Sequence, residues 1–262
     1  MEITYQLIIV LVMIGFVGSL LSGMLGMGGA IIKYPLLLFV PPLFGLAAFS
    51  AHQISGMIAV EVFFSAFIGM WAYRKDHYIH KQLTIYMGSA IVVGSLIGSF
   101  GSSYLSTSTI NIIYGILALL AAVLMFLPKK KEVATKYEDI VFHKPLAMIL
   151  AFIVGIGSGI VGAGGGFLIV PIMLTILNIP TRITLATSLA ITFISSIGGS
   201  IGKLVTGQVE YIPVLILIVV SFVAAPLGVK IGKAMNTKYL RIFLAILISA
   251  TAVKIWIEIL FK

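Results

Sequence analysis

Residues 22–38 read SGMLGMGGAIIKYPLLL, and residues 158–174 read SGIVGAGGGFLIVPIML. When Gly26 is aligned with Gly162, the four glycines of the first stretch fall on four glycines of the second, and Pro35 falls on Pro171. Each glycine costs about 1 kcal/mol relative to alanine in a helix interior, so four in such a short stretch break or sharply bend a helix. We therefore expect two broken helices at equivalent positions of a duplicated chain.

The composition around these stretches is that of an integral membrane protein. Of 262 residues, 60% are hydrophobic and only 10% are charged, against about 25% charged in soluble domains. Ten apolar runs are each long enough to cross or partly cross a membrane, at about residues 5–21, 24–48, 51–73, 83–104, 108–127, 146–162, 165–180, 184–204, 212–230 and 239–261. We expect an all-α polytopic membrane protein with eight to ten spans and glycine-broken helices at segments 1/2 and 6/7.

Five runs precede a polar, lysine-rich linker and five follow it. We expect a first transmembrane repeat at 1–127, a cytoplasmic linker at 128–144 and a second repeat at 145–262. An odd number of segments per repeat places the two copies in opposite orientations, and equivalent loops have indeed exchanged their basic residues. Thirteen of the seventeen lysines and arginines lie in the predicted inner loops, at 74–82, 128–144, 181–182 and 230–241. Both termini are then predicted to face outward.

The glycine motifs are the first candidates for a substrate site. Irregular backbone at membrane depth is tolerated where it is buried in protein or lines a cavity, and a broken helix directs free N–H groups and a positive dipole end toward a ligand. Paired breaks in two inverted halves point to a transporter's binding site; close helix packing through small residues is the alternative. The predicted site glycines are Gly26, Gly28, Gly29, Gly162, Gly164, Gly165 and Gly166.

These motifs resemble the paired signatures of the TauE/SafE family, also called the sulfite exporter or toluene-sulfonate-uptake superfamily. The resemblance rests on residues 26–35 and 162–171 and on Ala186-Thr187-Ser188-Leu189, and it covers nearly the whole chain. It implies a prokaryotic inner-membrane carrier for sulfur-containing anions such as sulfite, thiosulfate or organosulfonates. The first copy departs from the pattern at Ala30, which replaces the third glycine, and at Lys33, which replaces apolar Ile169.

Thr187 and Ser188 are predicted substrate ligands, and the alignment of Gly26 with Gly162 places them opposite positions 51 and 52 of the first copy. His52 and Gln53 there are predicted to donate hydrogen bonds to an oxyanion beside Thr187 and Ser188. The alternative is a polar pair that caps a helix at the outer boundary.

Lys33 and Glu61 are charged residues within apolar runs. Lys33 follows the first break and is predicted to supply positive charge to an anion site, unless it extends to the cytoplasmic headgroups. Glu61 lies near the middle of its run, where a carboxylate costs about 2.5–3.5 kcal/mol on the insertion scale. The same alignment pairs it with Ile197. We predict a proton-coupling role for Glu61, paired with Lys33; a protonated Glu61 bonded between helices is the alternative.

Together these features predict a secondary transporter that moves a small anion by proton-coupled export. An anion channel and a carrier for a non-sulfur organic anion are the alternatives. The net charge of +9 lies mainly in short loops, which argues against a nucleic-acid partner, and the expected partners are the anion and membrane lipid. A homo-oligomer is compatible with the sequence. We predict no enzymatic activity, cofactor or metal site, since no catalytic dyad, carboxylate pair or ligand cluster occurs within the predicted membrane segments.

Overall fold

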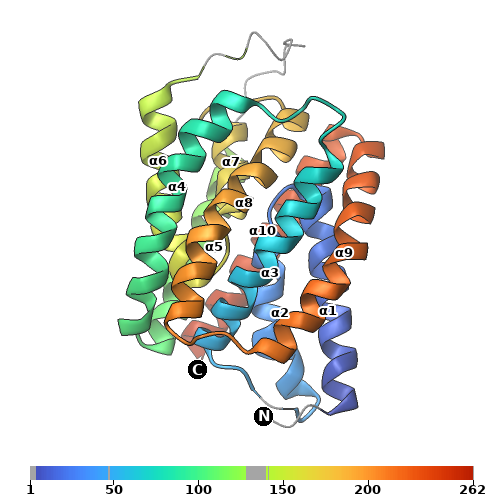
Figure 1. Cartoon of the computed structure of the whole chain (residues 1–262), viewed down its shortest axis with the longest axis vertical. Coiled ribbons are helices and arrows are strands. Elements are labelled where there is room, and N and C mark those ends of the chain that lie inside the picture. Colours follow the sequence, from blue (N-terminus) through green and yellow to red (C-terminus); the bar gives the residue numbers. More distant parts are fainter. Residues whose placement is uncertain (1–3, 47, 128–139, 141, 262) are drawn as a thin grey trace.

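The computed structural model describes residues 4–46, 48–127, 140 and 142–261, and these residues form a helical bundle (Figure 1). The first half contains α1 (Tyr5–Leu25), α2 (Ala30–Leu43), α3 (Ala51–Ala72), α4 (Lys81–Gly101), the short 3-10 helix η1 (Ser102–Tyr104) and α5 (Thr107–Phe126). The second half contains α6 (Lys144–Val161), α7 (Gly166–Thr175), α8 (Thr181–Val205), α9 (Tyr211–Ala234) and α10 (Thr237–Phe261). The predicted all-α polytopic fold is confirmed.

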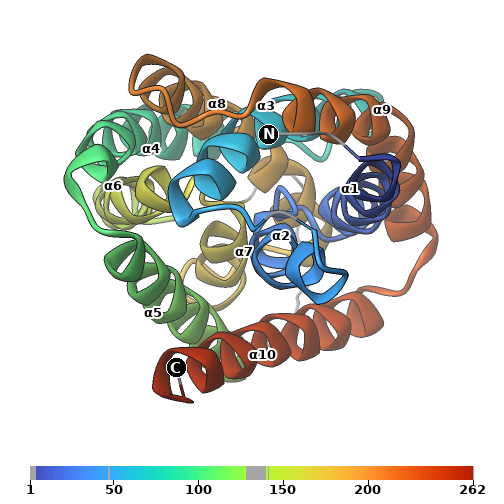
Figure 2. The ribbon, with the colours of Figure 1, turned by 90° about the horizontal axis from the view of Figure 1, so that it is seen from below.

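Eight of these helices are long and apolar enough to cross a membrane. The other two, α2 and α7, have 14 and 10 residues, which at 1.5 Å per residue span about 21 and 15 Å of a hydrocarbon core about 30 Å thick. They follow the two glycine motifs and lie in the middle of the bundle, surrounded by the longer helices (Figure 2). The two half-helices thus place both glycine motifs at the centre of the fold.

The two halves have the same order of long and short helices, and α1 and α6 begin at opposite ends of the bundle (Figure 1). Packing follows the same pattern, because α4 packs along α6 as α9 packs along α1. These correspondences support the interpretation of two inverted repeats. Residues 128–139 and 141 of the predicted linker lie outside the described residues. Helix α6 begins at Lys144, which is the last residue of the predicted linker.

The alignment of Gly26 with Gly162, a difference of 136 in residue number, does not hold beyond the half-helices. Helices α3, α4 and α5 begin at residues 51, 81 and 107, and α8, α9 and α10 begin at 181, 211 and 237, a constant difference of 130. The reason is that residues 30–50 separate the first break from α3, whereas the shorter segment 166–180 separates the second break from α8. The counterpart of Glu61 is therefore Ile191, not Ile197, and that of His52 is Arg182, not Ser188.

Packing around the glycines independently supports the new correspondence between α3 and α8. Added methyl groups on Gly28 and on Gly164 would both meet the side chains of Val62 and Thr192, at 2.8–3.1 Å. Val62 on α3 and Thr192 on α8 are counterparts when the two helices are aligned from their first residues. The two breaks therefore pack in the same way against the same pair of side chains, as expected around a twofold pseudosymmetry axis.

A matching side chain contacts a loop carbonyl at each end of the bundle. We call the end where α1 begins the outer end and the opposite end the inner end, following the loop charges. At the outer end, Nε2 of His52 lies 3.0 Å from the carbonyl oxygen of Leu105. At the inner end, Arg182 donates to the carbonyl oxygen of Met235 at 2.6 Å. Arg182 is the counterpart of His52 and Met235 that of Leu105, so the two ends carry equivalent contacts.

Candidate functional site

The two predicted helix breaks are confirmed, and their backbone has the conformation that requires glycine. Helix α1 is capped at its C-terminus by Gly26 (φ 69°), and α6 is capped by Gly162 (φ 78°). The next glycines of each motif also have positive φ, with 73° and 71° at Gly28 and Gly29. Glycine adopts this left-handed region without the steric penalty of a side chain, so the matching spacing of the motifs produces two matching turns.

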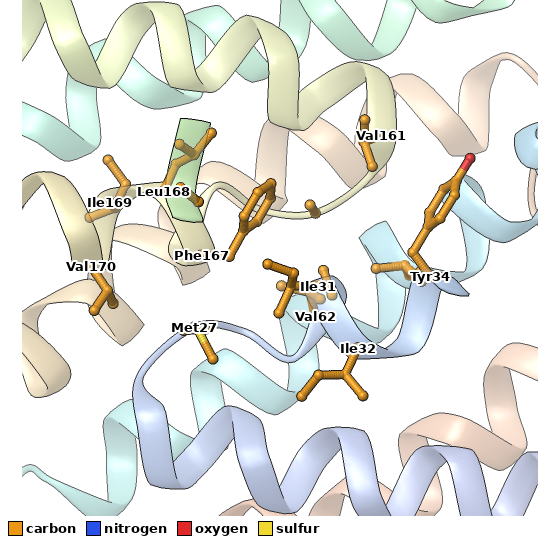
Figure 3. Packing of buried hydrophobic residues seen from close by; sticks show 14 of the residues in the cluster. Met27, Ile31, Ile32, Tyr34, Val62, Val161, Phe167, Leu168, Ile169 and Val170 are labelled. Carbon is orange, nitrogen blue, oxygen red and sulfur yellow. The ribbon is translucent and has the colours of Figure 1, made fainter. Parts of the chain in front are cut away.

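The two breaks contact each other in the core (Figure 3). A methyl group on Gly166 would lie 2.6 Å from the carbonyl oxygen of Met27, so the backbones of the two motifs are in direct contact. Residues 22–30 and 161–170 are buried. Side chains of Met27, Val62 and Phe167 surround the contact in Figure 3. The N-terminal ends of α2 and α7 therefore meet near one point, in an enclosed arrangement.

Several backbone N–H groups at this point have no acceptor. In the described part of the chain, no hydrogen bond is formed by the N–H groups of Gly28, Gly29 and Ala30, nor by those of Gly164, Gly165 and Gly166. The first N–H groups of a helix lack intrahelical partners, and they carry the positive end of the helix dipole. Two such sets, buried and close together, form a site that favours negative charge.

A buried hydroxyl lies at the same place. Oγ1 of Thr192 on α8 has no hydrogen-bond partner among the described residues, and it lies 2.5 Å from the position of a methyl group added to Gly166. The hydroxyl therefore faces the first turn of α7. A buried hydroxyl without a partner is unfavourable unless a ligand or water supplies one. Thr192 is a candidate site residue that the sequence did not reveal, because one threonine in an apolar run carries no distinguishing signal.

Lys33 and Glu61 form the buried ion pair that the sequence predicts. Nζ of Lys33 lies 2.5 Å from Oε2 of Glu61, and both side chains are completely buried. Ser19 on α1 joins them, because its hydroxyl donates to Oε1 of Glu61 at 3.1 Å and accepts from Lys33 at 3.0 Å. The ammonium is therefore inside the protein rather than at the headgroups. As a pair the two charges cancel, so Lys33 contributes no net charge to the core while Glu61 is ionised.

His52 and Gln53 do not lie beside Thr187 and Ser188. The first pair begins α3 at the outer end, and the second pair lies near the start of α8, which begins at the inner end. Gln53 forms a capping box with Ser50 and donates to Glu210 at 2.6 Å. The predicted shared oxyanion contact is thus not formed, and the contacts of His52 and Gln53 are those of the helix-capping alternative.

Thr187 and Ser188 have separate partners. The hydroxyl of Ser188 donates to the carbonyl oxygen of Gly26 at 2.7 Å, so Ser188 holds the first break in place from the opposite half. Thr187 instead accepts from the N–H of His80 at 2.9 Å, in the loop at the inner end. Ser188 therefore positions the backbone of the first break, and Thr187 binds the loop before α4 at the inner end.

His80 lies at the inner end and is the N-cap of α4. Its ring nitrogen Nδ1 accepts from the N–H of Leu83 at 3.2 Å, which caps the helix. Desolvation by burial lowers the pKa of His80 below its ordinary value of 6.5, which favours the neutral ring that can accept this bond.

A bundle of apolar helices around two interrupted half-helices, with free N–H groups at the meeting point, defines a polytopic membrane protein of the transporter class. Residues 11–255 match the family described as sulfite exporter TauE/SafE, and the chain belongs to this family.

Curated relatives agree with this assignment. The chain is 26% identical over 258 residues to the probable membrane transporter protein YunE of Bacillus subtilis, covering 92% of this chain and 94% of YunE. It is 25% identical over 239 residues to the probable membrane transporter protein YdhB of the same organism, covering 90% and 94%. No solved structure matches the chain. The chain is therefore a multi-pass membrane protein of a transporter family, and the names of its relatives indicate transport rather than catalysis.

Proposed function

We propose that the protein is a secondary transporter for a small oxyanion, which binds where the N-terminal ends of α2 and α7 meet. The observation that carries this proposal is the convergence of two sets of unpaired N–H groups on the unpaired hydroxyl of Thr192, among the residues that the structure describes. An oxyanion offers several acceptor oxygens to such donors, and helix N-termini favour negative charge. Rocking of one repeat against the other would expose the site to each side in turn.

A sulfur-containing anion such as sulfite, thiosulfate or an organosulfonate is the proposed substrate. The family's description as sulfite exporter supports this class. The polar groups at the break are hydrogen-bond donors, and the ammonium of the neighbouring Lys33 supplies a net positive charge when its partner Glu61 is protonated. A carrier for a non-sulfur organic anion would use the same donors and is the alternative within the same mechanism.

Lys33 and Glu61 supply a physical basis for proton coupling. With Glu61 ionised the pair is neutral; when Glu61 takes up a proton, the ammonium of Lys33 remains as a net positive charge close to the break. That charge favours an anion, and the bound anion in turn raises the proton affinity of Glu61, because the two equilibria are linked reciprocally. A proton and an anion are thus expected to cross together, with export when the outward anion gradient is dominant.

Sulfite, thiosulfate and organosulfonates should raise the thermal unfolding temperature of the purified protein. A ligand at a hundredfold excess over its dissociation constant stabilises the folded state by about 2.7 kcal/mol. Thr192→Val keeps the side-chain shape, removes the hydroxyl and should reduce this stabilisation. Thr251→Val, which loses a hydroxyl bonded within α10, is the matched control. Stabilisation by carboxylates alone would exclude the sulfur class, and equal stabilisation of both variants would exclude the site.

Glu61→Gln should uncouple anion movement from proton movement. In proteoliposomes with an outward anion gradient, the unmodified protein should carry protons out with the anion, as detected by an enclosed pH-sensitive dye. The amide cannot titrate, so the variant should show anion flux without a pH change. If the variant retains both the flux and its pH dependence, Glu61 is not the coupling residue. Saturable counterflow in the same vesicles distinguishes this carrier from an anion channel.

A further inference from the structure

Lys203 is a completely buried lysine near the outer end of α8, and it contacts no carboxylate in the described part of the chain. Its ammonium donates to four oxygen atoms at 2.7–2.9 Å: Oγ of Ser55, Oγ of Ser102, the carbonyl oxygen of Ile160 and Oε1 of Gln208. One nitrogen atom therefore joins α3, η1, α6 and the loop after α8. Its sequence context does not indicate this role, because Lys203 lies at the end of an apolar run beside a loop.

The two hydroxyl groups around Lys203 are oriented as acceptors. The hydroxyl of Ser55 donates to the carbonyl oxygen of His52 at 2.9 Å, and that of Ser102 donates to the carbonyl oxygen of Ser99 at 2.6 Å. Each hydroxyl has one hydrogen atom, and these bonds use it. Both oxygens consequently present lone pairs to the nitrogen of Lys203.

The remaining two neighbours are acceptors as well. The amide nitrogen of Gln208 donates to Oγ1 of Thr206 at 2.8 Å, which leaves its oxygen toward Lys203. The carbonyl of Ile160 belongs to the last turn of α6, where the helix dipole favours a cation. These four acceptors surround the nitrogen, an arrangement that suits a charged ammonium with three N–H groups. Within the described residues, the ammonium of Lys203 is stabilised by dipoles and has no carboxylate at ion-pair distance.

Lys203 borders the second glycine break. Helix α6 ends one residue after Ile160, at Val161, and a methyl group on Gly162 would overlap the carbonyl oxygen of Ser55. The buried ammonium therefore lies between the outer end and the candidate site. Lys33, on the first break, is paired with Glu61, so the two lysines differ in the net charge that they present.

We propose that Lys203 is an outer anion-recognition site, which takes the same small oxyanion as it enters or leaves the central site. Opening of the outer end separates α3 and η1 from α8, so the ammonium loses Ser55 and Ser102, and oxygen atoms of the anion take their places. In the closed state the protein's own oxygens fill those positions. This inference rests on the proposed transport of an anion. It adds to that mechanism a second binding site, which carries the positive charge of Lys203.

Single cysteine substitutions can report the electrostatic field of the Lys203 ammonium through the rates at which charged reagents modify them. The chain contains no cysteine, so each variant has one reactive thiol. Ser102→Cys places a thiol against Lys203, and Ser103→Cys, at an exposed position, is the matched control. A thiosulfonate reagent with a sulfonate group should modify position 102 about tenfold faster than one with a quaternary ammonium group, since a nearby cation attracts the former and repels the latter. Lys203→Gln should abolish the preference at 102 and leave position 103 unchanged.

An added organosulfonate, which does not react with the thiosulfonate reagents as sulfite would, should slow modification at 102 but not at 103. The inference is overturned if the preference at 102 is absent, if it survives Lys203→Gln, or if neither reagent reaches position 102. Should Lys203→Gln fail to fold, Lys203→Arg must retain the preference, and raised salt must reduce it. These outcomes test Lys203 separately from the proposed function. If sulfite stabilises the protein but position 102 shows no charge preference, only the outer site at Lys203 is excluded. If position 102 shows the preference but no anion stabilises the protein, the central site is excluded.

Discussion

Lys33→Ile and Glu61→Ile should each lower the free energy of unfolding by about 3–5 kcal/mol, because each leaves the partner charge buried without compensation. Both side chains are completely buried and 2.5 Å apart. The double variant Lys33→Ile/Glu61→Ile should recover most of that loss, since removal of both charges also removes the cost of their desolvation.

The double variant gives the first half the residues that occupy the equivalent positions of the second half. The residues equivalent to Lys33 and Glu61 are Ile169 and Ile191, both buried, so the fold accommodates an isoleucine pair at this place. Stability is measured as thermal unfolding in detergent. Lys233 and Asp76 form an ion pair whose side chains are 30% and 31% exposed, and breaking it is the control, with an expected cost of at most about 1 kcal/mol. A double variant less stable than either single variant would contradict the assignment.

The double variant also separates stability from function. It is expected to fold but to lose the pH dependence of anion transport, because no titratable group remains in the pair. Ser19 then loses both of its polar partners, so the double variant should recover somewhat less than the full loss in the free energy of unfolding. A stable variant with unchanged pH dependence would place the coupling group elsewhere.

The glycine motifs allowed the breaks and the half-helices to be predicted from the sequence. Four glycines with the same spacing in both halves determine the backbone turns at Gly26 and Gly162. The conformation of such a turn depends mainly on the residues within it. The pairing of Glu61 with Lys33 was also predictable, because charges within apolar runs require partners. These features are local or are set by composition, and the structure places them as expected.

Contacts between distant helices were not predictable in the same way. The longer segment between the first break and α3 changes the offset of every later helix from 136 to 130, and an ungapped comparison does not reveal such a change. His52 was therefore aligned with Ser188, although the two belong to opposite ends. Thr192 and Lys203 were overlooked for a related reason: their roles depend on neighbours in other helices, such as Gly166 and Ser55, and not on their own sequence context.

Gly162→Ala should be among the most damaging substitutions in the chain, with a loss of stability of about 2–5 kcal/mol, the sum of two effects. Its φ of 78° costs a residue with a side chain about 1–2 kcal/mol, and the new methyl group would overlap the carbonyl oxygen of Ser55, which adds about 1–3 kcal/mol of overpacking. A backbone carbonyl cannot rotate away as a side chain does.

Two other glycines separate these causes. Gly207 has a φ of 69° and nothing within 4 Å of an added methyl group, so Gly207→Ala reports the backbone strain alone. Gly101, the last residue of α4, also has open space and no positive φ, and Gly101→Ala should be neutral or stabilising by up to about 1 kcal/mol. Thermal unfolding of the three variants should rank Gly101→Ala above Gly207→Ala and Gly162→Ala last. Equal losses at 207 and 162 would mean that α3 does not pack closely on the second break.

Gly164→Ala tests the meeting point itself. Its methyl group would lie 2.8 Å from Cγ1 of Val62 and 2.9 Å from Cγ2 of Thr192, so two side chains obstruct it, in addition to the strain of its φ of 62°. Val62→Ala should therefore partly rescue Gly164→Ala in unfolding temperature, but it should not rescue Gly162→Ala. Because Gly28 packs on the same two side chains, Val62→Ala should rescue Gly28→Ala to a similar extent. Rescue of one and not the other would show that the two breaks do not share one centre, and the shared anion site would then be excluded.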